Sequence, residues 1–166
     1  MEAASKRAER QPGRPLPSLA EALAMAAAAP LTEYTAQPVR RETLRAAYVL
    51  PLHLCPPTNR TRGAMAWIGA RLKAELWGLM GRPLSGLTGN LLPRPQVICT
   101  RFSSVEPDKF ADWAKLPVDM LCEPKGRAVR HRLGFLLDDS PANVELHQLW
   151  TKGAPRMGFV VIEVRS

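Results

Sequence analysis

Hydrophobic positions along most of the chain follow helix-like and strand-like spacings in turn. Apolar residues three and four positions apart predict a helix over Ala64–Met80, and alternation predicts a strand over Gln96–Phe102. Pro107–Leu121 has helical spacing again, with Pro117 as an expected kink. Three more strands are expected, at Ala47–Leu54, Val144–Trp150 and Gly158–Val164. This order predicts an α+β fold, a small mixed or antiparallel sheet with helices packed on it.

Two features refine the expected strands. The Ala47–Leu54 strand contains a proline, which cannot donate a backbone hydrogen bond, so it is expected at a sheet edge or at a bulge. The last two strands are expected to be joined by a turn at Lys152–Arg156.

The first 45 residues differ from the rest in being rich in proline and alanine. Ser18 can cap a short helix that runs to Ala29, because Glu21 stands three residues later, as a capping box requires. Pro30 is expected to end this helix. Since so short a helix is marginal in isolation, residues 1–45 are interpreted as a mobile extension and residues 46–166 as the folded domain.

The composition is that of a globular protein, with 46% hydrophobic and 23% charged residues. No uncharged apolar run is long enough for a membrane span, so a membrane location is not expected. Three scattered cysteines without metal-site spacing indicate reduced thiols in a cytoplasmic protein. The net charge is +8, and arginine supplies 17 of the 23 cations. Because guanidinium groups pair well with phosphate, this excess suggests a polyanionic partner such as nucleic acid.

All five aspartates lie between Asp108 and Asp139, and Glu106 stands just before them. Glu106 and Asp108 are two residues apart after a predicted strand, so both carboxylates can face one ion. Carboxylates without nearby histidine or cysteine suit Mg²⁺ or Mn²⁺. Lys115 stands about two helical turns after Asp108, where it can contact a phosphate. The alternative is that these acids mark a helix start and an ordinary Asp-Asp-Ser-Pro turn, and that Lys115 is a surface lysine.

Three stretches resemble one known family, the RusA family of Holliday-junction resolvases and related phage endonucleases. The first is YVLPLHLCPPTNR, beginning at Tyr48, and the second is the acidic cluster followed by Lys115 and Asp119. The third is LGFLLDDSPANVELHQLWTKG followed by GFVVIEV, beginning at Leu133. The resemblance covers about 120 residues and implies a RusA-like fold and a symmetric homodimer.

The resemblance also implies roles for individual residues. The metal carboxylates correspond to Glu106, Asp108 and Asp139, with Asp138 beside them, and the catalytic lysine corresponds to Lys115. The implied catalytic set is therefore Glu106, Asp108, Lys115 and Asp139. The chain departs from the family where Glu106 replaces an aspartate, where Lys109 replaces an asparagine, at Pro117, and in about ten extra residues, Glu123–Arg132.

A set of basic residues is expected to contact DNA phosphates, although solvated loops are the alternative. These residues are Arg60, Arg62, Arg101, Lys109, Lys125, Arg127, Arg130 and Arg132. The resulting hypothesis is a Mg²⁺-dependent endonuclease, without an organic cofactor, that resolves four-way junctions by paired nicks in DNA recombination and repair. One alternative is a catalytically weakened or inactive DNA-binding relative. Another is an interaction protein that uses the N-terminal helix.

Overall fold

A four-stranded sheet forms the centre of the protein, with the strand order β1-β4-β2-β3. In the computed structural model, residues 15–30, 38–56, 66–81, 91–107, 112–123, 133–153 and 157–166 are described. The strands are β1 (Leu44–Pro51), β2 (Gln96–Ser103), β3 (Glu145–Lys152) and β4 (Phe159–Arg165). Strand β4 pairs antiparallel with β1 and β2, whereas β2 and β3 are parallel. The predicted α+β class with a mixed sheet is confirmed.

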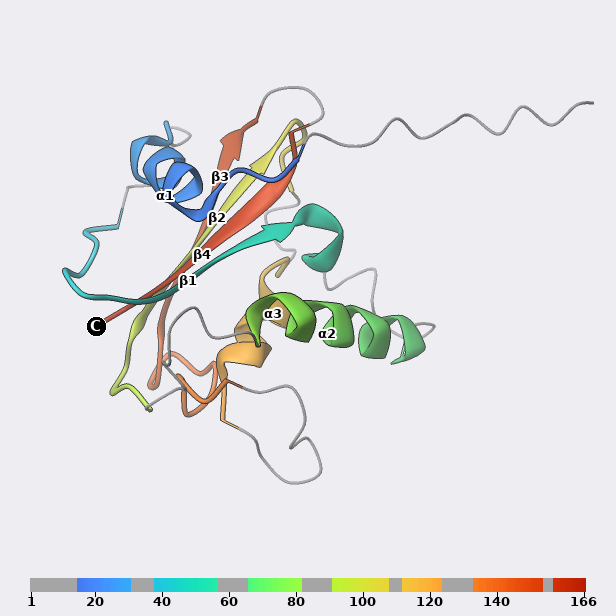
Figure 1. The fold of residues 1–166 in the computed structure, drawn as a ribbon. Coiled ribbons are helices and arrows are strands. Elements are labelled where there is room, and N and C mark those ends of the chain that lie inside the picture. Colours follow the sequence, from blue (N-terminus) through green and yellow to red (C-terminus); the bar gives the residue numbers. More distant parts are fainter. Residues whose placement is uncertain are drawn as a thin grey trace, which may run out of the picture.

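Helices cover both faces of this sheet (Figure 1). Helix α1 (Leu19–Ala28) lies on one face, and α2 (Ala66–Met80) and α3 (Lys115–Leu121) lie on the other. A short 3₁₀ turn, Leu52–Leu54, follows β1. In the described part of the chain, no helix is both long and apolar enough to cross a membrane.

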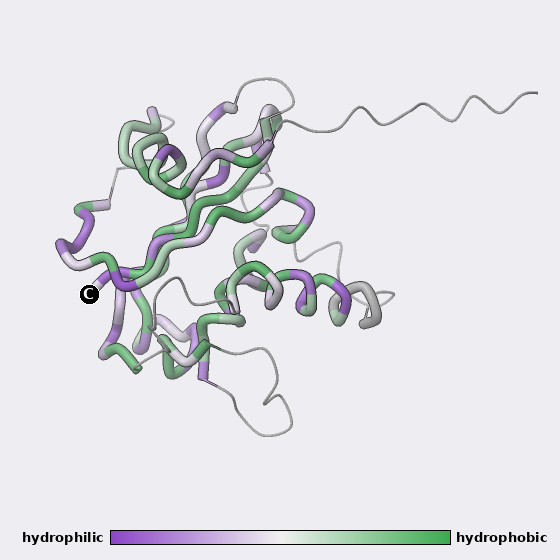
Figure 2. Tube along the Cα trace, in the orientation of Figure 1, coloured by the Kyte–Doolittle hydropathy of each residue, from purple (hydrophilic) through white to green (hydrophobic). Residues whose placement is uncertain are grey.

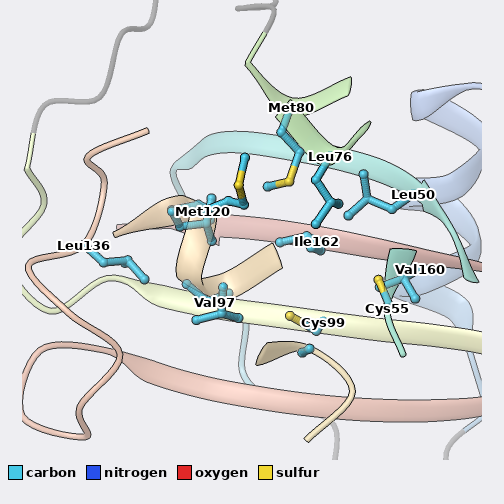
Figure 3. Packing of buried hydrophobic residues seen from close by; sticks show 14 of the residues in the cluster. Leu50, Cys55, Leu76, Met80, Val97, Cys99, Met120, Leu136, Val160 and Ile162 are labelled. Carbon is cyan, nitrogen blue, oxygen red and sulfur yellow. The ribbon is translucent and has the colours of Figure 1, made fainter. Parts of the chain in front are cut away.

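Strand β4 supplies core residues to both faces because its side chains alternate. Val160, Ile162 and Val164 belong to the larger core beneath α2 and α3. Figure 3 shows Leu76 and Met80 of α2 packed over this face. On the opposite face, Phe102 and Phe159 stack with their ring centroids 4.5 Å apart and pack beneath α1. Long hydrophobic stretches accordingly run through the centre of the sheet, whereas hydrophobic and hydrophilic residues alternate along α2 (Figure 2).

The predicted N-terminal helix is present, with its capping box. The Ser18 hydroxyl accepts a hydrogen bond from the Glu21 amide at 3.3 Å, and the Glu21 carboxylate accepts one from the Ser18 amide at 2.9 Å. Ala22 and Ala26 are fully buried against the sheet. The interpretation of residues 1–45 as a mobile extension therefore does not describe α1, which packs as part of the domain. Alanine suits this position because its small side chain allows the helix to approach the strands closely.

Some element boundaries differ from the sequence prediction. Strand β1 begins at Leu44 and ends at Pro51, and it lies at the edge of the sheet. This position suits the proline, because it has no backbone N–H to donate to a neighbouring strand. Helix α3 begins at Lys115 and not at Pro107, because Trp113 and Ala114 form a turn. Pro117 consequently lies in the first turn of α3, where an N–H has no helical acceptor, and the expected kink does not arise.

The last two strands are not neighbours, although a short connection joins them. Strand β2 lies between β3 and β4, so the end of β3 and the start of β4 both lie beside the C-terminal end of β2, while residues 154–156 of the expected turn lie outside the described residues. At this end of β2 the Gly153 amide donates to the Ser103 carbonyl at 3.1 Å. A Cβ atom on residue 153 would lie 3.3 Å from the Ser103 nitrogen, so glycine allows this close approach.

Candidate functional site

The candidate site is centred on Lys115, the first residue of α3. Its ammonium Nζ lies 2.8 Å from Oδ1 of Asp119, one helical turn later. It also contacts Oδ2 of Asp139, which belongs to the segment before β3. The Lys115 side chain remains 39% exposed, so a ligand in solvent can reach it. The structure thus brings together three residues that the sequence analysis singled out, two of them far apart in the chain.

These two carboxylates stabilise the positively charged form of Lys115. Burial disfavours the ammonium form, but the hydrogen bonds and negative charges of Asp119 and Asp139 outweigh it. The pKa of Lys115 is therefore raised above its usual value, and the side chain is a permanent cation at neutral pH. A fixed cation with access to solvent is suited to contact a phosphate or a developing negative charge.

A hydrogen-bonded turn holds the segment that carries Asp139. Oδ1 of Asp138 accepts hydrogen bonds from the Ser140 amide at 3.0 Å and from Nδ2 of Asn143 at 2.8 Å. The Ser140 hydroxyl donates to the same oxygen. Asp138 therefore stabilises this turn, as the alternative interpretation of the Asp-Asp-Ser-Pro stretch proposed, and Asp139 is the member of the pair that meets Lys115.

The sheet holds the segment that leads into α3. Nε2 of Gln148 on β3 donates to Oδ1 of Asp112 at 3.1 Å. Trp113 and Ala114 are buried in the larger core. Because these three consecutive residues precede Lys115 directly, the position of its backbone is set by packing against the sheet.

Arg101 on β2 is bound within the protein, although the sequence analysis assigned it to DNA. One guanidinium nitrogen donates to the Cys55 carbonyl at 3.2 Å, and the guanidinium carbon lies 5.6 Å from the ring centroid of Trp113. Burial lowers the pKa of Arg101. These contacts give Arg101 a packing role beneath the start of α3, and contact with DNA remains a prediction.

The remaining predicted site residues divide into two groups. Glu106 is exposed and follows β2 by three residues, and it is not among the partners of Lys115. The others lie outside the described residues, namely Arg60, Arg62, Asp108, Lys109, Lys125, Arg127, Arg130 and Arg132.

The described ranges contain no group of three or more His, Cys, Asp or Glu residues that could hold a metal ion. Asp139 and Glu106 have the hard oxygen donors that Mg²⁺ prefers. Asp139 and Glu106 alone are too few to hold the ion. A magnesium site would need a further carboxylate, and Asp108 is the residue that the sequence predicts for it.

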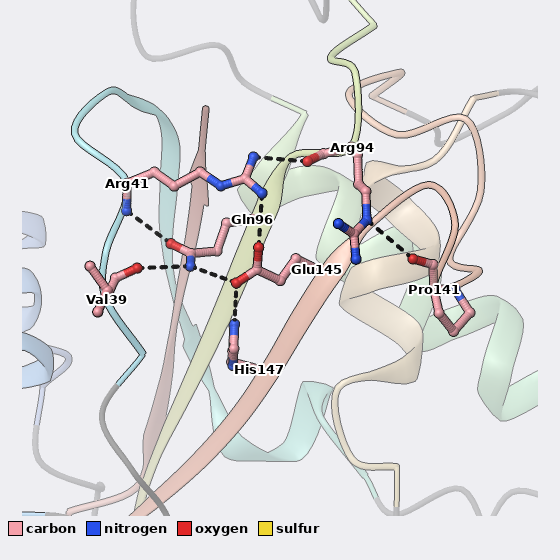
Figure 4. A network of polar contacts seen from close by, with 7 residues as sticks. All are labelled: Val39, Arg41, Arg94, Gln96, Pro141, Glu145 and His147. Atoms are coloured by element: carbon pink, nitrogen blue, oxygen red, sulfur yellow. Dashed lines mark hydrogen bonds and ion pairs between the residues drawn. The ribbon is translucent and has the colours of Figure 1, made fainter.

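A second polar cluster joins the segment before β1 to the sheet (Figure 4). Glu145 of β3 accepts hydrogen bonds from Arg41 at 2.8 Å and from Gln96 at 3.0 Å, and it contacts Nε2 of His147 at 2.8 Å. The contacts with His147, Gln96 and Arg41 lower the pKa of Glu145 to about 2. The cluster anchors residues 38–43 to the start of β2 and β3.

A buried carboxylate makes a related connection. Glu163 of β4 is 1% exposed and pairs with Arg40 at 3.3 Å and with Arg165 at 2.7 Å. Arg40 also donates to the Ala26 carbonyl in the last turn of α1, at 2.9 Å. This connection was not predicted from the sequence, although a glutamate within the apolar run GFVVIEV was a signal for it, since a buried charge requires partners.

The three cysteines are buried thiols that form no disulfide bonds within the described part of the chain. Burial raises the pKa of Cys55 to about 12 and that of Cys99 well above its usual value. Neither of these two thiols is a nucleophile at neutral pH, because the thiolate is the reactive form.

No family model, curated protein or solved structure matches this chain. The functional assignment accordingly depends on the residues of the candidate site and on the resemblance of the three sequence stretches.

Proposed function

We propose that the protein is a RusA-like, Mg²⁺-dependent endonuclease that cuts branched DNA, including four-way junctions. The observation that carries this proposal is the contact between Lys115 and Asp139, because the resemblance implies these two residues as the catalytic lysine and a metal carboxylate. The net charge of +8 supports a polyanionic substrate.

The roles of the protein's own groups follow from their charge and exposure. Lys115 would contact the phosphate that is cut, and this contact strengthens as negative charge develops on the phosphate. Asp119 would keep the lysine charged and oriented. Asp139, with Glu106 and Asp108, would hold the divalent cation. When bound, that cation supplies an activated water and charge neutralisation.

A homodimer belongs to the same proposal. A four-way junction has approximate two-fold symmetry, and two copies of one site related by a two-fold axis can nick opposed strands. The paired nicks expected of a resolvase then require one active Lys115 and one active Asp139 in each subunit.

A non-catalytic DNA-binding relative is the second candidate. Two features of the sequence favour it, since Glu106 and Lys109 replace the aspartate and the asparagine of the family pattern. Such a protein would keep the basic surface and bind branched DNA, and the same residues would hold the fold together without cutting.

Cleavage of a labelled synthetic four-way junction separates these functions. We expect paired nicks with Mg²⁺ or Mn²⁺, their loss in Asp139→Asn, and wild-type cleavage in Glu75→Gln. Glu75 is a suitable control because it is exposed on α2 and pairs with His53 at 2.9 Å, so its substitution removes one charge outside the site. Tight junction binding without nicks under either metal would support the non-catalytic relative, and neither binding nor nicks would refute both.

A further inference from the structure

A buried serine lies at the point where β2 ends and the acidic segment begins. Ser103 is the last residue of β2 and is 4% exposed. Its hydroxyl donates to the Val105 carbonyl at 2.7 Å. It accepts from Nε1 of Trp150 on β3 at 3.0 Å and from Nε of Arg101 at 3.4 Å. One donor and two acceptor positions are the full hydrogen-bonding capacity of a hydroxyl, so each is used here.

The hydroxyl of Ser103 sets the direction in which the chain leaves the sheet. Its bond to the Val105 carbonyl spans the bend at residues 104–105, and Glu106 is the next residue. The backbone of Ser103 is itself held, because its carbonyl accepts from the Gly153 amide. The start of the acidic segment is therefore tied to both β2 and β3, although Val105 and Glu106 are exposed.

The same cluster reaches the other half of the candidate site. Arg101 contacts Ser103 through Nε, and its guanidinium group packs over Trp113, two residues before Lys115. A single group of buried and half-buried side chains thus supports both the segment that carries Glu106 and the start of α3. Misplacing a catalytic group by about 1 Å can cost on the order of 100-fold in rate.

We infer that Ser103 is a positioning residue for Glu106, the first carboxylate after β2, an inference that rests on the proposed nuclease function. Ser103 does not contact the substrate in this role. It acts through Val105, Arg101 and Trp150, whose polar groups lose a common partner when the hydroxyl is removed.

The test compares Ser103→Ala with Ser103→Thr and with Thr100→Val. Ser103→Thr keeps the hydroxyl in a strand-compatible side chain. Thr100 is a matched control, because it is fully buried on the same strand and its hydroxyl has no hydrogen-bond partner among the described residues. Trp150→Phe removes the indole N–H that donates to the Ser103 hydroxyl. This variant replaces Ser103→Ala in the test if Ser103→Ala does not fold.

Two measurements are made on each variant, one of them independent of activity. In Ser103→Ala we expect the NMR order parameters of the Val105 and Glu106 amides to fall from about 0.85 to below about 0.6. We expect kcat on branched DNA to fall on the order of tenfold or more, with the KM nearly unchanged. Ser103→Thr is expected to restore both quantities, and Thr100→Val is expected to leave both at wild-type values.

The outcomes separate the two levels of the proposal. Unchanged order parameters in Ser103→Ala, or an unchanged kcat beside an active wild type, would overturn the positioning role and leave the nuclease function intact. A fall in kcat that Thr100→Val shares equally would also overturn it, because general loss of core stability then explains the effect. A wild-type protein that cuts no branched DNA would refute the nuclease function, whatever the order parameters show.

Discussion

The ammonium group of Lys115 contacts the carboxylate of Asp139, which lies 24 residues further along the chain. Helix α3 presents the lysine, and a turn stabilised by Asp138 presents the aspartate. Both segments are held by packing or by hydrogen bonds that do not involve the pair itself. The two segments are therefore held in place independently of the contact between Lys115 and Asp139. Lys115 remains accessible to solvent.

If Lys115 stabilises charge on the reacting phosphate, its removal should affect the chemical step more than binding. Lys115→Met is expected to lower the single-turnover rate on branched DNA on the order of 100-fold, with little change in the Kd for DNA. Lys73→Met is the matched control, because Lys73 is an exposed lysine on α2. Equal losses in both variants would show that only overall charge matters.

Glu163 is expected to be the most important carboxylate for stability. Its removal leaves Arg40 and Arg165 without their shared, buried partner. Glu163→Gln should lower the free energy of unfolding by about 3 kcal/mol, measured by urea denaturation. Glu42→Gln changes the same charge at an exposed position and should stay within about 0.5 kcal/mol of wild type. Similar values for the two variants would contradict the role of this connection.

Glu145 is expected to make the free energy of unfolding depend on pH in the acidic range. Because folding lowers the pKa of Glu145 from 4.5 to about 2, the native state binds its proton less readily than the unfolded state does. The resulting stability is fully present above pH 4.5 and is lost as the pH falls toward 2. The stability difference between wild type and Glu145→Gln should therefore narrow over this range in urea unfolding. A difference that stays constant would show that the contacts with His147, Gln96 and Arg41 do not lower the pKa of Glu145 in solution.

A substitution in the capping box of α1 tests whether this helix folds together with the sheet. Ser18→Ala removes the side-chain acceptor for the Glu21 amide and should cost about 1 kcal/mol of global stability. Thermal unfolding should remain a single transition at a lower Tm. If Ser18→Ala alters only the helix signal in circular dichroism and leaves the Tm unchanged, α1 opens independently of the domain.

Local patterns in the sequence predicted the main elements closely. The spacing of apolar residues placed a helix that ends at Met80, and alternation placed a strand that begins at Gln96, as the structure shows. Ser18 and Glu21 identified the start of α1 because a capping box is made by residues three positions apart. Pro51 indicated an edge strand for a similarly local reason. Helix α3 was placed too early, because the burial of Trp113 in a turn depends on residues of other elements.

The sequence by itself determined the elements, the fold class and the residue types available for chemistry, since these depend on neighbours in the chain. Only the tertiary structure decided that β2 separates β3 from β4, that Arg40 meets Glu163, and which of the adjacent aspartates meets Lys115. It also decided that Ser103 joins two strands to the segment before Glu106. Each of these relationships joins residues on different elements, and packing of the sheet and its helices sets their distances.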